Sequence, residues 1–102
     1  MSIKVKMIIP DKIKICGKTY IIEIRNNRCT TDGVDFGASG SNWSQKIWID
    51  NDQHIEGQEE NLFHEVIELI SREMDFKLDH SVISTLSNIL YQVLKDNNLL
   101  KE

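Results

Sequence analysis

The chain has 102 residues, of which 40% are hydrophobic and 27% are charged, and this composition is typical of a globular domain with one small core. Its 12 basic and 16 acidic residues give a formal net charge of −4 without a basic stripe, so we expect no nucleic-acid partner. No segment approaches the run of about 18 apolar residues that a membrane helix needs, and no export signal follows the start, so we expect no membrane partner.

The first half of the chain is predicted to be mainly β-structure. Apolar and polar residues alternate over residues 3–8, 12–16 and 19–24, and turn signals separate these segments. Residues 30–44 contain three glycines and several small polar residues, which indicates a loop around a weak strand. The alternation is cleanest from Gln45 to Asp50, where we predict a further strand.

Two cysteines, Cys16 and Cys29, fall in this half and form no C-x-x-C pair. We expect them to be buried, reduced thiols of a cytoplasmic protein. The alternatives are a disulfide or a thiolate metal ligand.

The second half is predicted to form two helices. Apolar residues recur with a helical period over residues 57–75, and again over residues 79–96, where Asp79 is a good N-cap. The connection between them is short, so the two helices are expected to pack against each other. The apolar face of the second helix comprises Val82, Ile83, Leu86, Ile89, Leu90, Val93 and Leu94.

The predicted fold class is α+β, in a single domain over residues 1–102. Residues 1–50 are expected to be mainly β and residues 57–96 to hold the two helices. A small antiparallel N-terminal sheet would then be packed by two C-terminal helices.

A histidine and two carboxylates stand close together in the first predicted helix, in the sequence His64-Glu65-Val66-Ile67-Glu68. This sequence differs by one residue from H-E-x-x-H, in which two histidines one turn apart hold zinc and the glutamate activates water. Positions 64 and 68 lie about 40° apart on a helix, so their side chains project side by side. His64, Glu65 and Glu68 all lie off the predicted apolar arc, as the residues of an ordinary exposed helix face would.

His80, in the first turn of the second predicted helix, can supply a third ligand. It follows Glu68 by twelve residues and a tight turn, so it can reach the pair on the first helix. His64, Glu68 and His80 would then hold one zinc ion per chain and leave a fourth position open, as in catalytic zinc sites. Glu65 becomes the candidate general base, which accepts a proton from water that zinc has acidified. The alternative is a helix-start histidine partnered by Asp79.

The stretch from Gln45 to Asn97 resembles a family of small phage and prophage proteins with a zincin-like metallopeptidase fold. The matching segments are Lys46-Ile47-Trp48-Ile49-Asp50, Gln58-Glu59-Glu60, Leu62-Phe63-His64-Glu65-Val66-Ile67 and Leu90-Tyr91-Gln92-Val93-Leu94-Lys95-Asp96-Asn97. Typical relatives carry H-E-x-x-H, with a glutamate in the following helix at or beside position 80. Here histidine and glutamate have exchanged places between positions 68 and 80, which keeps two histidines and one carboxylate.

The resemblance implies a zinc-dependent peptidase that acts in the cytoplasm of a bacterial host cell. It also implies that a peptide or protein pairs with an exposed edge strand, which we place at Gln45 to Asp50, beside the apolar surfaces of Trp43 and Trp48. Two alternatives use the same residues: a catalytically inactive interaction module, and a structural zinc that ties the helices together. A non-haem iron oxygenase could use the same ligands but would need a larger β-barrel than this chain can build.

Overall fold

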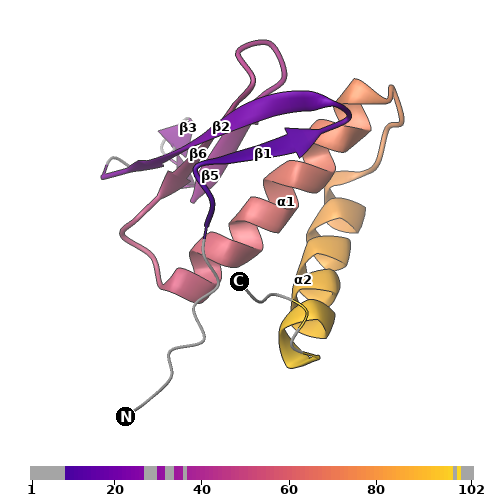
Figure 1. Cartoon of the computed structure of the whole chain (residues 1–102). Coiled ribbons are helices and arrows are strands. Elements are labelled where there is room, and N and C mark those ends of the chain that lie inside the picture. The colour runs from indigo at the N-terminus through magenta and orange to yellow at the C-terminus, as the bar shows by residue number, and fades with distance from the viewer. Residues whose placement is uncertain (1–8, 27–29, 32–33, 36, 98, 100–102) are drawn as a thin grey trace.

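The elements follow the predicted order, with strands before helices. The computed structural model describes residues 9–26, 30–31, 34–35, 37–97 and 99. Its elements are β1 (Lys12–Ile15), β2 (Lys18–Arg25), β3 (Thr30–Thr31), β4 (Val34–Asp35), β5 (Ala38–Ser41), β6 (Lys46–Asp50), α1 (Ile55–Glu73) and α2 (His80–Asp96) (Figure 1). The predicted strand over residues 3–8 lies outside the described residues, as does Cys29.

The sheet has four strands in the order β1-β2-β6-β5, while β3 and β4 form a separate pair. The β1–β2 and β5–β6 pairs are antiparallel, but β2 and β6 run parallel. A parallel pair needs a long crossover, which residues 26–45 supply before the chain enters β6 beside β2. The predicted α+β class with an N-terminal sheet is therefore confirmed, although the sheet is mixed rather than antiparallel throughout.

The turn between β1 and β2 explains why Cys16 is exposed rather than buried as predicted. Cys16 and Gly17 both have positive φ, at 51° and 81°. Two such residues form the tight hairpin turn that matches the twist of the flanking strands. The turn projects beyond the sheet, so the thiol lies in solvent.

The core lies between α1 and one face of the sheet. Alternate side chains of β2 and β6 point to this face because side chains of a strand alternate between its two sides. Leu62 and Leu69, two turns apart on α1, complete the core. The buried cluster comprises Ile15, Tyr20, Ile22, Ala38, Ile47, Ile49, Leu62 and Leu69.

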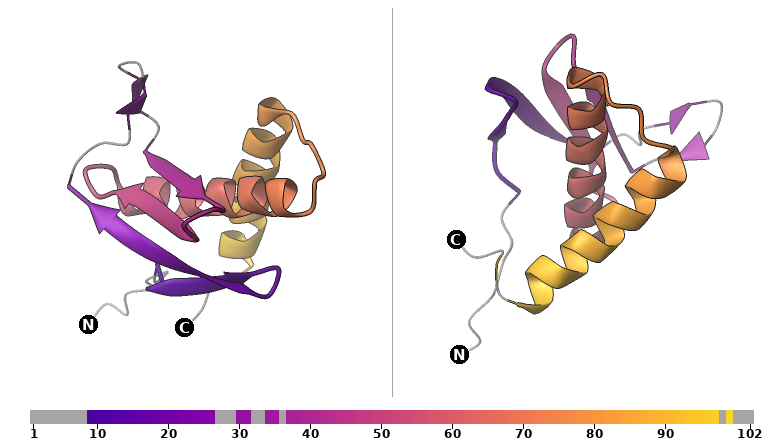
Figure 2. Two further views of the ribbon diagram at one scale, coloured as in Figure 1. Left: turned by 90° about the horizontal axis from the view of Figure 1, so that it is seen from above. Right: turned by 90° about the vertical axis from the view of Figure 1, so that its right-hand side faces the viewer.

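Helix α2 packs on α1 and contacts no strand among the described residues (Figures 1 and 2). Tyr91 is the main anchor: its ring lies 5.9 Å from that of Phe63, and its hydroxyl donates a hydrogen bond to the buried carboxylate of Glu59. The prediction that both helices pack on the sheet is thus wrong for α2. None of the helices within the described residues is long and apolar enough to cross a membrane.

The connection between the helices is fixed by hydrogen bonds to Ser71, which is buried near the end of α1. Its hydroxyl donates to the carbonyl of Phe76 and accepts from the backbone N–H of Leu78, at 3.3 Å. Asp79 then caps α2 through its carbonyl, which accepts from the N–H of Ile83 at 3.0 Å. This defined path determines where the first residue of α2, His80, is placed.

Candidate metal centre

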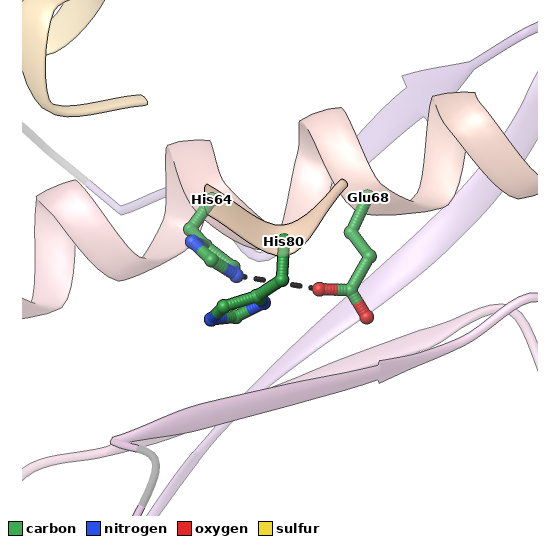
Figure 3. Close-up of side chains that lie close together, drawn as sticks. All are labelled: His64, Glu68 and His80. Carbon is green, nitrogen blue, oxygen red and sulfur yellow. Dashed lines mark ion pairs between the residues drawn. The ribbon is translucent and has the colours of Figure 1, made fainter. Parts of the chain in front are cut away.

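Three candidate ligands from two helices converge on one space. His64 and Glu68 stand one turn apart on α1, and His80 reaches towards them from the start of α2 (Figure 3). One ligand atom from each residue lies within 4.8 Å of those of the other two. The structure therefore brings together the three residues that were predicted from the sequence to be metal ligands.

The spacing of these groups suits a small cation. His64 Nε2 lies 3.3 Å from Glu68 Oε2, and the two imidazole rings have their centroids 5.0 Å apart at 60°. Two ligands each about 2.0–2.1 Å from one tetrahedral ion lie roughly 3.3 Å apart. Two imidazoles and one carboxylate also form the donor set of known catalytic zinc sites, so the residues fit zinc.

Charged neighbours shift the pKa values of His64 and Glu68 in opposite directions. A hydrogen bond to Glu68 and the nearby carboxylates raise the pKa of His64 above its ordinary value. The His64 imidazole and then the Arg72 guanidinium lower the pKa of Glu68 to about 2. A metal ion would compete with a proton for the His64 imidazole, because a histidine ligand must be neutral.

Glu65 lies beside this cluster but on the side of the sheet. It is only 7% exposed, and burial and then the neighbouring Glu68 raise its pKa to about 7. The prediction that Glu65 lies off the apolar arc is therefore wrong, because it is buried on the same side of α1 as Leu62 and Leu69. A carboxyl group with a pKa near neutrality can both accept and release a proton under physiological conditions.

Gly40 on β5 makes the close approach of Glu65 possible. A methyl group at Gly40 would lie 3.2 Å from Glu65 Oε1 and 3.2 Å from Leu69 Cδ1. Such contacts are tighter than normal packing, so any larger residue would displace the carboxylate or the core leucine. The glycine thus brings the backbone of β5 next to the candidate base.

A cleft of about 540 Å³ contains these groups. Helix α1 forms its floor, β5 one wall and α2 the other. The α1 residues that line it include His64, Glu65, Glu68 and Arg72, and the α2 wall comprises His80, Ser84, Ser87 and Asn88. The cleft is therefore polar around the ligand cluster.

Arg72 is a cation in this cleft that the sequence analysis missed. Its guanidinium donates to Glu68, one turn earlier on α1, and to the carbonyl of Gly40 at 3.4 Å. It also donates to Asn42 Oδ1, at 3.3 Å. The spacing of four residues from Glu68 was the available signal for this contact. Arg72 thus connects the candidate ligand on α1 to the backbone of β5.

The structure corrects the position of the predicted edge strand. Gln45 to Asp50 corresponds to β6, which is paired on both sides, with β2 and with β5. The edge strand next to α1 is β5, Ala38–Ser41, whose residues line the cleft. Trp43, which follows β5, is 96% exposed, whereas Trp48 on β6 lies beneath the guanidinium of Arg25 at 4.7 Å.

No protein-family model, curated protein or solved structure matches this chain. The geometry of the cleft and the chemistry of the residues that line it are therefore the observations that point to a function.

Proposed function

We propose that this chain binds one zinc ion through His64, Glu68 and His80 and hydrolyses a peptide bond. The observation that carries this proposal is the convergence of the three ligand atoms beside a buried carboxylate, Glu65, with a pKa of about 7. A fold does not need two histidines and two carboxylates in one cleft, because such groups lose hydration energy there. Perturbed pKa values of this kind cluster at functional sites.

Glu65 is the proposed general base. Zinc supplies Lewis acidity at such sites, which polarises a carbonyl and lowers the pKa of water towards 7. Glu65 is close to the ligands but outside their cluster, so its carboxylate stays available to accept the proton of the attacking water. Its buried position between α1 and β5 holds the side chain in place before the reaction.

The outer side of β5, the last strand of the four-stranded sheet among the described residues, is the proposed binding site for the peptide. An extended peptide can add to an exposed strand through main-chain hydrogen bonds, which recognise backbone rather than sequence. The edge borders the cleft, and Gly40 on it lies beside Glu65, so an added strand would pass the candidate base. The exposed Trp43 next to β5 offers an apolar contact for a substrate side chain.

The replacement Glu65→Gln tests this function. The untagged chain is loaded with zinc and incubated with a broad peptide pool, and cleavage is followed by mass spectrometry. We expect the variant to retain one zinc ion per chain and to lose about 10²–10⁴-fold in cleavage rate, the usual contribution of a general base. Glu56→Gln, an exposed position on the same helix, is the matched control and should leave cleavage unchanged.

A second candidate function is an inactive interaction module with the same cleft. The ion pair of Arg72 with Glu68 favours it, because a carboxylate that is already neutralised is a weaker metal ligand. This module would bind a peptide on β5 without cleaving it. Absence of any cleavage by the zinc-loaded wild-type chain would support the module and contradict the peptidase.

A further inference from the structure

Helix α2 carries a second apolar surface that no part of the described chain covers. We call Val82, Leu86, Ile89, Leu90 and Val93 the outer face of α2. These five side chains are between 41% and 54% exposed. The residues of α2 that are buried are Ile83, Ser87 and Tyr91, which lie on the side towards α1. The apolar stripe of α2 is thus wider than the surface that α1 covers.

The spacing of the outer face is that of helices that pair with other helices. Val82, Leu86, Ile89 and Val93 are separated by four, three and four residues, the alternation of a coiled-coil seam. These four residues extend over about three turns, or roughly 17 Å of helix. A second helix with the same spacing can insert its side chains between them.

The size of the outer face matches the apolar centre of a protein interface. Five aliphatic side chains, each about half exposed, form a patch on the order of a few hundred Å², the size of the largest apolar patch on a typical monomer, which is often functional. A stable interface buries about 800 Å² per partner, of which roughly 65% is apolar at its core. The outer face supplies most of that apolar area, and polar neighbours such as Thr85 and Gln92 can form the rim.

The self-complementary spacing and the area of the outer face favour a second copy of the chain as the occupant, and its charge pattern allows one. Residues 81–94 contain no charged side chain, although the whole chain has a net charge of −4. An uncharged face offers no attraction to an acidic or basic partner. Two copies would repel each other through most of their surfaces, but they can approach through this face without placing like charges together.

We propose that the outer face of α2 binds the same face of a second copy, which gives a two-fold symmetric dimer. The same seam on both helices is self-complementary, as a two-fold interface requires. The contact lies on the side of α2 away from the cleft, so both clefts stay open in the dimer. This inference does not rest on zinc binding or on peptide cleavage.

Sedimentation equilibrium of the untagged, full chain tests the dimer, from about 5 to about 500 µM. We expect the wild-type mass to rise from one chain to two over this range. The double replacement Leu86→Glu/Ile89→Glu should weaken association by about 100-fold or more, because it places like charges on both halves of the contact. Gln92→Glu adds the same charge to the same helix beside the seam and is the matched control, for which we expect continued association.

Circular dichroism checks that each variant keeps its helices. If the charged double variant unfolds, Leu86→Ala/Ile89→Ala replaces it, since alanine favours the helix, and association should still weaken about tenfold or more. A wild-type chain that stays monomeric at about 500 µM would overturn the proposal and assign the face to a different macromolecule. A dimer that persists in a folded double variant would also overturn it, because another surface would then hold the chains together.

Discussion

The two sides of α1 differ in what they bury. The side towards the sheet is mainly apolar, where Leu62 and Leu69 pack in one cluster with residues of β2 and β6, and Glu65 is buried at its border with β5. The other side, which faces α2, carries His64 and Glu68 beside the contact of Tyr91 with Phe63. The apolar side stabilises the fold by removing side chains from water, whereas the polar side gains little from burial. We therefore expect the sheet contact to determine stability and the α2 contact to position the proposed metal site.

The sheet side should show the largest effect on stability. We expect Leu69→Ala to lower the free energy of unfolding by about 3 kcal/mol, because Leu69 is fully buried and its loss leaves a cavity. The measurement is urea denaturation of the metal-free chain. Ile70→Ala, at the neighbouring and half-exposed position, is the control and should cost much less. Equal losses at both positions would contradict the assignment of the core.

The α2 side should show its largest effect on metal binding instead. We expect His80→Ala to weaken zinc binding by more than about 100-fold, since even residues that only orient a ligand contribute 10–100-fold. The metal-free variant should keep the stability of the wild type to within about 1 kcal/mol, because His80 is exposed. Competition with a zinc-binding dye measures the affinity. His54→Ala removes the remaining histidine and should change nothing; a similar loss in both variants would contradict the site.

A smaller effect should appear in the pH dependence of stability. Burial raises the folded-state pKa of Glu65 from its ordinary value of 4.5 to about 7, so the folded chain holds this proton more tightly than the unfolded chain. The contribution of Glu65 to the free energy of unfolding is therefore fully present below pH 4.5 and is lost as the pH rises through 7. We expect metal-free Glu65→Gln to exceed the wild type by about 2 kcal/mol at pH 8 and to match it near pH 4.5.

Urea denaturation in the presence of a chelator gives this difference at each pH. The contribution of Glu68 has the opposite sign: its pKa is lowered to about 2, so its stabilisation is present above pH 4.5 and is lost as the pH falls towards 2. Both proteins contain Glu68, so its effect largely cancels in the comparison. A difference that does not change between pH 4.5 and pH 8 would show that Glu65 is not buried as described.

The periodicity of apolar residues was sufficient to predict both helices, and the short connection between them was sufficient to predict that His80 lies near Glu68. Helix α1 begins two residues before the predicted Gly57, and α2 follows Asp79 as expected. A short connection has few possible conformations, and these bring His80 close to Glu68. The same periodicity could not show that α2 packs only on α1, since an apolar stripe does not specify what covers it.

The edge strand and the burial of Glu65 could not be predicted, because both depend on contacts between segments that are far apart in the sequence. Strand β5, Ala38-Ser39-Gly40-Ser41, contains no β-branched or aromatic residue, so its sequence resembles a loop. Its pairing with β6 depends on the crossover and on Gly40, which lets β5 approach α1. Glu65 is buried because β5 lies close to α1. A helical wheel of α1 alone does not show which strand lies beside the helix.

Zinc titration of the metal-free, untagged chain shows whether His64, Glu68 and His80 form a metal site. We expect one zinc ion to bind per chain and the triple variant His64→Ala/Glu68→Ala/His80→Ala to bind none, while both proteins give the same circular dichroism spectrum. A wild-type chain that binds no zinc at saturating concentration, or a triple variant that binds it equally well, would contradict the account.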